Sequence, residues 1–139
     1  MKVTQETLAV ATKARGFHDL TADVRAVVAR SGVRTGLCTV FVQHTSASLL
    51  IQENADPSVL RDLGRWLDQL APEDANAYEH DAEGPDDMPS HLKSAMTRAS
   101  ESIPVVEGKL ALGTWQAIYL VEHRRHPHDR RAIVHVTGI

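Results

Sequence analysis

The segment from His44 to Pro57 holds side chains that a strand does not need for packing alone. A histidine, a threonine and two serines come first, an apolar run follows, and a glutamate, an asparagine and an aspartate come last. Polar groups of these kinds at the end of a strand supply the hydrogen bonds and proton transfer that a site for a polar ligand or a metal requires. We therefore predict a site here, with Thr45 in contact with substrate and with the candidate catalytic residues His44, Ser46, Ser48, Glu53 and Asn54.

Part of this segment has a structural alternative. Serine and threonine hydroxyls often cap backbone groups at turns, and Asn54 is of a common turn type. Asp56 directly precedes Pro57, a pair typical of a helix start in which the aspartate is the cap. Glu53 and Asn54 nevertheless lie at the end of the strand that follows His44, so we expect them to reach what His44 reaches.

A second group of candidate ligands lies in the acidic stretch 73–89, which contains proline and glycine and shows no periodicity. A loop of this length in a small domain is typically functional or disordered. His80 and His91 bracket several carboxylates, and a neutral imidazole with two or three carboxylates suits Mg²⁺, Mn²⁺ or Zn²⁺. Acidic loops are ordinarily solvated surface, and the spacing shows no compact ligand pattern. The predicted metal ligands are His44, His80, Asp87 and His91.

A third motif, Gly113–Gln116, lies where a hairpin strand passes into a long strand. A glycine at such a point indicates a bend or a close backbone approach. The amide of Gln116 needs hydrogen-bond partners if Trp115 beside it is buried, and a place in the core is the alternative for this tryptophan. We predict Gln116 as a further catalytic residue and Gly113, Thr114 and Trp115 as contacts to substrate.

These motifs need a fold that positions them. Alternating β-forming residues predict strands, and apolar residues recurring on one face predict helices. We expect one domain over residues 1–139, an α+β fold of about seven strands and three helices, in which the last four strands pair as sequential antiparallel neighbours and residues 16–19 form a turn. The predicted strands span 3–12, 37–43, 47–52, 103–106, 109–112, 116–122 and 132–137, and the predicted helices span 21–30, 57–70 and 89–100. The second helix is expected to bury Leu60, Leu63, Leu67 and Leu70.

Composition disfavours several classes of function. The net charge is −3, with no block of five basic residues, which argues against a nucleic-acid partner. No apolar run approaches the roughly 20 residues of a membrane span, and the N-terminus lacks a signal-peptide core, so we expect no membrane partner and a cytoplasmic location. Cys38 is the single cysteine and is expected to be buried without a disulfide.

The chain resembles the YjbQ family over nearly its whole length. The resemblance rests on the motifs Gln43–Ser48, Glu53–Pro57, His80–His91 and Gly108–Gln116. It implies an antiparallel, jelly-roll-like β-sandwich with about three flanking helices, a homotrimer, and a site of histidines and carboxylates near a subunit boundary. Many members have an asparagine after the loop glycine and four residues before the histidine. This chain differs there, so Asp86 or Asp87 stands in for the amide.

The resemblance also implies a thiamine-phosphate synthase, which joins a hydroxymethylpyrimidine diphosphate to a thiazole phosphate and releases diphosphate. Such a reaction would use a divalent metal for the diphosphate, Trp115 as a wall for the pyrimidine cation, and Lys109 or Arg131 as contacts to phosphate. The sequence contains no dedicated phosphate cradle. The alternative is therefore a homotrimer that binds a metal or a small ligand without efficient turnover, and a third hypothesis is a regulatory or assembly partner.

Overall fold

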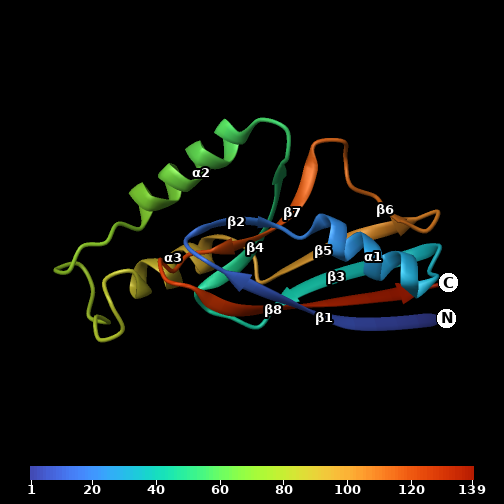
Figure 1. Ribbon diagram of the computed structural model, residues 1–139, viewed down its shortest axis with the longest axis horizontal. Helices are drawn as coiled ribbons and strands as arrows, with labels where there is room; N and C mark the ends of the chain where they lie inside the picture. The colour runs from blue at the N-terminus through green and yellow to red at the C-terminus, as the bar shows by residue number, and fades with distance from the viewer.

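Two antiparallel sheets make up the framework of the chain (Figure 1). The computed structural model describes residues 1–139. One sheet has the strand order β1-β8-β3-β5-β6, and the other has the order β2-β7-β4. The strands are β1 (Lys2–Thr12), β2 (Gly16–Asp19), β3 (Thr35–Val42), β4 (Ala47–Glu53), β5 (Ser100–Val106), β6 (Lys109–Leu110), β7 (Gln116–Glu122) and β8 (His128–Gly138), and the helices are α1 (Thr21–Ser31), α2 (Pro57–Leu70) and α3 (Asp87–Met96).

The core lies between the sheets and α1. On β3 and β8 every second side chain is buried, as in a sheet with one face toward the core. Strand β7 instead buries all residues from Ala117 to Glu122, and α1 adds Val24, Val27 and Val28 from one face. The predicted α+β class with three helices is confirmed, and Cys38 is buried in this core, where burial raises its thiol pKa to about 11. The jelly-roll arrangement stays a prediction.

The predicted pairing of the last four strands is wrong except for the hairpin of β5 and β6. Strand β7 pairs with β2 and β4, and β8 pairs with β1 and β3. Strand β7 is buried on both faces, so water cannot reach its backbone groups, and both of its edges have to pair with other strands. Residues 16–19, predicted as a turn, form β2 and supply one of those neighbours.

Helix α2 differs from the prediction in which side chains it buries, and helix α3 differs in where it begins. Asp56 caps α2 as expected, accepting a hydrogen bond from the Ser58 amide at 2.9 Å. Of the predicted leucine stripe only Leu67 is fully buried, and Leu70 is 48% exposed. Helix α3 begins at Asp87, two residues before Pro89, because the amides of a first helical turn need no intrahelical partner.

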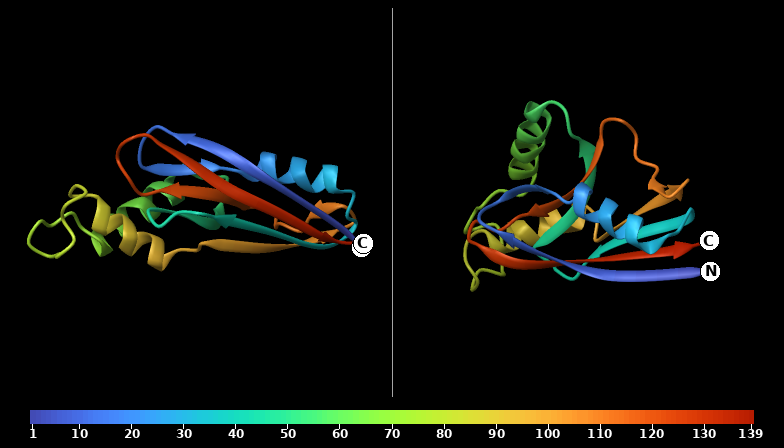
Figure 2. Two further views of the ribbon diagram at one scale, coloured as in Figure 1. Left: turned by 90° about the horizontal axis from the view of Figure 1, so that it is seen from below. Right: turned by 45° about the vertical axis from the view of Figure 1, so that its right-hand side comes forward.

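The molecule is elongated, and its two chain ends lie together at one end (Figure 2). Helix α3 and the connection from α2 to α3 lie at the opposite end (Figures 1 and 2). None of the three helices has both the length and the apolar composition needed to cross a membrane. The predicted metal ligands of the 73–89 stretch therefore lie far from the chain ends.

The first prediction concerns Gly36, which faces Gly138 across β3 and β8. A Cβ at position 36 would lie 2.0 Å from the carbonyl oxygen of Thr137, which is backbone and cannot move alone. We expect Gly36→Ala to lower the free energy of unfolding by about 1–3 kcal/mol, measured by urea denaturation. Gly64→Ala is the control, because its Cβ would make only an ordinary 3.7 Å contact with Phe17. Equal midpoints for wild type and Gly36→Ala would contradict the prediction.

Candidate functional site

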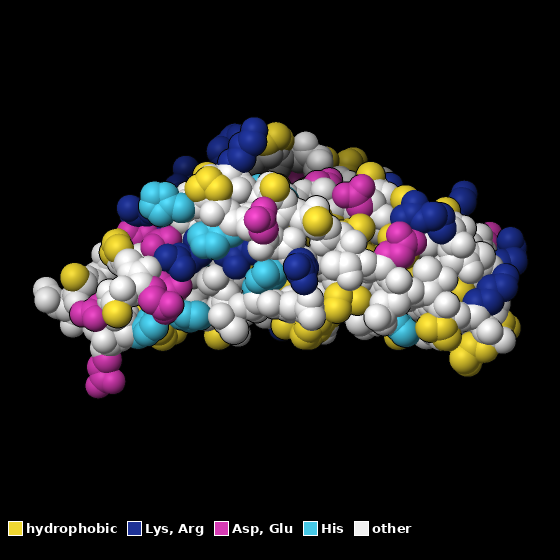
Figure 3. Space-filling model, turned by 60° about the horizontal axis from the view of Figure 1, so that its bottom comes forward, with side chains coloured by type: hydrophobic (Ala, Val, Ile, Leu, Met, Phe, Trp, Pro, Cys, Tyr) yellow, Lys and Arg dark blue, Asp and Glu magenta, His cyan; other side chains and the backbone are white.

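Four side chains with metal-ligating atoms converge at the start of α3. They are His80, Glu83, Asp87 and His91, and one ligand atom from each lies within 4.8 Å of the other three. Helix α3 places Asp87 and His91 on one face, since residues four apart are neighbours on a helix. The preceding loop contributes the other two. Figure 3 shows histidine, acidic and basic side chains gathered at this end of the molecule.

Asp87 is the centre of this cluster and is almost fully buried. Its Oδ2 lies 2.7 Å from His80 Nε2 and 3.1 Å from His91 Nε2, and its Oδ1 accepts a hydrogen bond from Arg124 Nη1 at 2.8 Å. Burial alone would raise the pKa of Asp87. The hydrogen bond with His80 and the charges of His91 and Arg124 outweigh burial, so the pKa is lowered and the carboxylate is ionised.

The hydrogen bond of His91 Nδ1 determines whether His91 Nε2 donates or accepts. Nδ1 lies 3.0 Å from the carbonyl oxygen of Thr45, which can only accept, so Nδ1 carries the proton. In the neutral ring Nε2 then carries a lone pair and can only accept. It faces a carboxylate oxygen of Asp87, which can also only accept. Two acceptors at this distance need a cation between them, either a proton or a metal ion. A histidine that donates its other N–H to a backbone carbonyl is the usual arrangement of a metal ligand.

Arg124 and Asp86 hold the loop against this cluster. Arg124 donates to Asp86 Oδ2 at 3.1 Å and to the carbonyl oxygen of Glu83 at 2.9 Å. The Arg125 amide donates to Asp86 at 2.9 Å. Although burial opposes ionisation of Asp86, these contacts lower its pKa to about 2. The loop therefore has fixed partners where Glu83 and Asp87 enter the site.

His44 does not join the cluster, contrary to its prediction as a metal ligand. Its Nε2 accepts a hydrogen bond from the Arg131 amide at 2.8 Å, and its Nδ1 lies 3.5 Å from Arg130 Nη1. Burial first, and then the charge of Arg130, lower the pKa of the ring. The lone pair needed for a metal is thus already used, and His44 connects the end of β3 to β8.

The hydroxyl groups of the same motif face inward. Arg130 donates to Ser46 Oγ at 3.0 Å and to Ser46 O, and Arg130 itself pairs with the fully buried Glu122. Ser48 is also buried, and its Oγ lies 2.8 Å from His123 Nε2. Thr45 contributes its carbonyl oxygen to His91. In this structure Ser46 and Ser48 serve local hydrogen-bond networks.

The buried His123 gives a prediction about pH. Burial first, and then the charge of Lys93, lower the pKa of His123 to about 3, so the folded chain keeps this ring neutral while the unfolded chain protonates it near pH 6.5. The unfolded state binds the extra proton between these values, so stability is lost as the pH falls below 6.5. We expect a loss of about 2 kcal/mol from this residue at pH 5. Urea denaturation between pH 7 and 5 should show a shallower pH dependence for His123→Gln, and an unchanged one would contradict the assignment.

The remaining predicted residues lie at the far end of β4. Glu53 ends this strand six residues from Ala47, which is about 20 Å in an extended strand, and Asn54 follows it directly. The Asn54 amide donates to the Trp115 carbonyl at 2.9 Å, and Gln116 Oε1 accepts from the Gly113 amide at 2.8 Å. Glu53 and Asn54 therefore do not reach His44 within one chain, contrary to the prediction.

Four residues predicted to contact substrate are exposed and do not share one surface. Trp115 is 61% exposed, which excludes its alternative place in the core, and Thr114 beside it is also exposed. Lys109 is exposed on the edge strand β6, which two strands separate from β8 and its exposed Arg131. The structure brings Lys109 and Arg131 neither together nor into the cluster of His80, Glu83, Asp87 and His91.

Four residues of the cluster and of the neighbouring hydrogen-bond networks were not predicted as site residues. They are Glu83, a fourth candidate ligand, and Arg124, His123 and Arg130, which support other side chains. No local pattern marks these four. Asp87 and His91 were predicted as ligands, and they also have the spacing of two residues on one helix face, but this signal was hidden because the helix was predicted to start at Pro89.

The cluster offers two imidazole nitrogens and two carboxylates, and it is open to solvent on one side. The side chains of Glu83 and His80 are 64% and 43% exposed, whereas that of Asp87 is 5% exposed. Ligands about 2.1 Å from a tetrahedral ion lie about 3.4 Å apart. A set already within 4.8 Å needs only small movements to reach that geometry.

Comparisons with known proteins agree over almost the whole chain. A family model described as UPF0047 protein YjbQ-like matches residues 6–139. A UPF0047 protein from Synechocystis sp. is 58% identical over 134 residues, which are 96% of this chain and 91% of that protein. UPF0047 protein YjbQ from Escherichia coli O157:H7 is 46% identical over 135 residues, covering 96% of this chain and 97% of that protein.

The solved structures give the same result for the fold. A YbjQ-like protein of unknown function from Sulfolobus solfataricus P2 matches with a TM-score of 0.89 at 29% identity, over 99% of each chain. A conserved protein of the YjbQ/UPF0047 family from Clostridium acetobutylicum matches with a TM-score of 0.85 at 37% identity, over 96% of this chain and 99% of that chain. Sequence and fold together show that this chain belongs to the UPF0047 family of YjbQ-like proteins.

Proposed function

We propose that this protein binds one divalent transition-metal ion through His80, Glu83, Asp87 and His91. The observation that carries the proposal is the orientation of His91. Its Nδ1–H is held by the Thr45 carbonyl, which turns the Nε2 lone pair toward Asp87 Oδ2 at 3.1 Å. A neutral imidazole leaves these groups facing each other as two acceptors, and a metal ion satisfies both of them in place of a proton.

The donor set favours Zn²⁺ or Mn²⁺ over Mg²⁺. Imidazole nitrogen suits transition metals, whereas Mg²⁺ prefers an octahedron of oxygen ligands. Without metal, the hydrogen bond to Asp87 raises the pKa of His80, which favours a proton on this ring that a metal ion would have to displace. Metal affinity should consequently rise with pH across the titration of His80.

Metal analysis of the purified protein tests this proposal. After incubation with Zn²⁺, Mn²⁺ or Mg²⁺ and removal of free ion, we expect about one Zn²⁺ or Mn²⁺ per chain. His91→Ala should lose the ion. His126→Ala is the matched control, because His126 is exposed, its ring makes no hydrogen bond, and it lies outside the set of four ligands. A wild-type protein that retains none of the three ions would overturn the proposal.

We also propose that the chain assembles as a homotrimer through the outer face of the five-stranded sheet. Phe41 lies opposite Ile133 on β3 and β8, and Leu37 lies on the same face as Phe41. Phe41 and Leu37 are 44% and 42% exposed, and contiguous apolar patches commonly mark interfaces. Figure 3 shows hydrophobic side chains along the lower margin of this side of the molecule. Light scattering should give a trimer mass for wild type and a monomer mass for Phe41→Glu; a monomeric wild type would overturn this proposal.

A thiamine-phosphate synthase activity is the second candidate function. The observation that favours it is the combination of a candidate metal centre with Arg124 and the half-exposed Arg125 beside it, since a diphosphate leaving group needs a metal ion and cationic donors. The test incubates the metal-loaded protein with hydroxymethylpyrimidine diphosphate and thiazole phosphate and measures thiamine phosphate and released diphosphate. Product no higher than in a protein-free control would remove this candidate and leave the metal proposal unaffected.

A further inference from the structure

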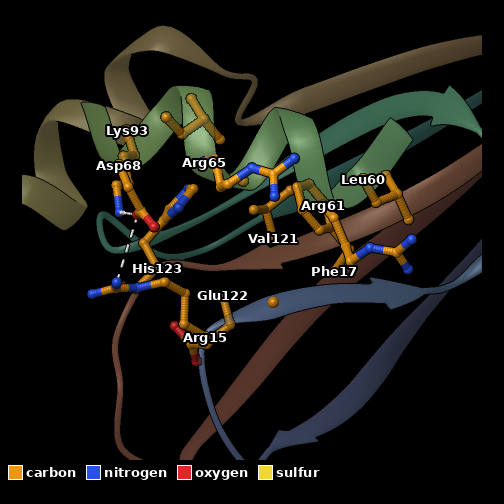
Figure 4. Close-up of a pocket in the computed structure, with 13 residues that line it drawn as sticks. Arg15, Phe17, Leu60, Arg61, Arg65, Asp68, Lys93, Val121, Glu122 and His123 are labelled. Atoms are coloured by element: carbon orange, nitrogen blue, oxygen red, sulfur yellow. Dashed lines mark hydrogen bonds and ion pairs between the residues drawn. The ribbon is translucent and has the colours of Figure 1, made fainter. Parts of the chain in front are cut away.

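We propose that a cavity beneath α2 binds a small organic anion with a planar apolar body, of the class of aryl phosphates and aryl carboxylates. The cavity lies between α2 on one side and the β2 and β7 segments on the other, and it has a volume of about 420 Å³ (Figure 4). Sites for small molecules typically have volumes of 300–1,000 Å³. This proposal does not rest on the proposed metal centre.

The charged groups around the cavity leave an excess of positive charge. Four cationic side chains line it, namely Arg15, Arg61, Arg65 and Lys93, against the two carboxylates of Asp68 and Glu122. Glu122 is already neutralised by Arg130, which does not line the cavity. Asp68 is shared between Lys93 at 2.5 Å and Arg15 at 3.5 Å, and Arg15 also pairs with Glu73 at 2.7 Å. The excess positive charge therefore comes from the two arginines on α2.

The two arginines on α2 are the groups best placed to meet an anion. Arg61 makes no ion pair with any residue, and the only ion pair of Arg65 is with Asp62, one turn earlier on the exposed face of the helix. Figure 4 shows Arg61 and Arg65 on the α2 side of the cavity and Phe17 on the opposite side. Guanidinium groups bind planar anions through paired N–H donors and also stack on aromatic rings.

The apolar wall and Gly64 shape the space for a flat group. Phe17, Leu60, Leu67 and Val121 line the cavity. Gly64 also lines it from the middle of α2, and a Cβ there would lie 3.7 Å from Phe17 Cε2. Glycine inside a helix costs about 1 kcal/mol relative to alanine. A Cβ at this distance would be in ordinary van der Waals contact with the ring, so Gly64 lets the helix backbone lie close to Phe17, and the space for a ligand lies beside this contact.

His123 adds one directional polar contact. It is 1% exposed and lines the cavity, and its Nε2 is hydrogen-bonded to Ser48. Its Nδ1 makes no hydrogen bond within the chain, so it is available to a polar atom of a ligand. A buried histidine in an apolar and cationic cavity, with one nitrogen unpaired, is the kind of orienting group found in binding sites.

The cavity is distinct from the cluster of metal-ligating residues. Lys93 follows His91 by two residues on α3, which turns it by about 200° around the helix axis, away from the cluster. None of the four proposed metal ligands lines the cavity. The two sites can therefore be tested separately.

Isothermal titration of the full chain with phenyl phosphate tests the proposal, with EDTA present to exclude binding through a metal. We expect one saturable site in wild type, weakened at least tenfold in Arg61→Gln/Arg65→Gln and lost in Gly64→Leu, whose side chain would fill the space over Phe17. Arg25→Gln/Arg34→Gln is the matched control, because it removes the same charge from exposed positions outside the cavity. It should bind as wild type does.

Two further probes separate the anion from the ring. Inorganic phosphate and benzyl alcohol should each bind at least tenfold more weakly than phenyl phosphate, since each lacks half of the recognised group. No saturable binding of phenyl phosphate by wild type up to about 10 mM would overturn the proposal. So would equal binding by Gly64→Leu, or equal weakening in both double-arginine variants, because surface charge alone would then explain the attraction.

Discussion

Asp87→Asn is expected to lower the affinity of the protein for Zn²⁺ by at least about 100-fold, more than the 10- to 100-fold typical of residues that only support a ligand. Asp87 joins every part of the cluster, because Oδ2 meets His80 and His91 while Oδ1 is held by Arg124. An amide removes the negative charge, and its NH₂ group cannot bind a metal. The measurement is a competition titration against a chromophoric chelator at pH 7.5.

The control for this experiment is Asp81→Asn. Asp81 is an exposed carboxylate of the same loop, outside the set of four ligands, so its removal changes the net charge equally. It should bind Zn²⁺ as wild type does. Circular dichroism of Asp87→Asn has to match wild type, since this substitution also weakens the contact with Arg124. Equal affinity of wild type and a folded Asp87→Asn would place the metal elsewhere.

The cluster shows what a sequence can and cannot reveal about a site. His80, Asp87 and His91 were predictable because ligand-type residues gather in one aperiodic stretch, and the structure brings these three together. The exclusion of His44 was not predictable. Its lone pair is used by the amide of Arg131, 87 residues further along the chain, and no local pattern announces such a hydrogen bond.

In the fold, too, features set by local interactions were predicted, and features set by distant interactions were not. Two local features were predictable from residues a few positions apart. One is the cap of α2 by Asp56, and the other is the two-residue connection between the predicted strands 103–106 and 109–112, where Glu107 and Gly108 adopt positive φ. The pairing of β1 with β8 joins the two ends of the chain, and β7 takes its neighbours from two distant segments. These partners lie far apart in the sequence, and no local pattern specifies which distant strands will pair.

A buried ion pair connects the two sheets near the candidate site. Glu122 ends β7 of the smaller sheet, and Arg130 lies on β8 of the larger one. Glu122 accepts hydrogen bonds from Thr12 at 2.6 Å and from Arg130 at 2.8 and 2.5 Å. Burial alone would raise the pKa of Glu122, but these donors outweigh it and lower the pKa, so the pair is ionised. Arg130 in turn holds Ser46. The segment after His44 is thus fixed by a charge pair inside the protein.

Glu122→Gln is therefore expected to lower the free energy of unfolding by about 3–5 kcal/mol, because it leaves the charge of Arg130 buried without a partner. This is a large share of the 5–15 kcal/mol typical of a domain. The measurement is urea denaturation at pH 7. Arg30→Met, which breaks the exposed pair with Glu6, is the control and should have little effect.

The double variant Glu122→Leu/Arg130→Met separates the cost of an unpaired charge from the value of the pair. Apolar side chains of similar size remove both charges, and such replacements are often neutral or stabilising. We expect the double variant to be more stable than Glu122→Gln, even though it has lost every hydrogen bond between the two residues. If the double variant is also less stable than the wild type, the pair itself contributes net stability. The double variant can be more stable than Glu122→Gln and still show faster amide exchange at Ser46. That result would mean that the segment after His44 has lost its order and that the pair serves to position this segment.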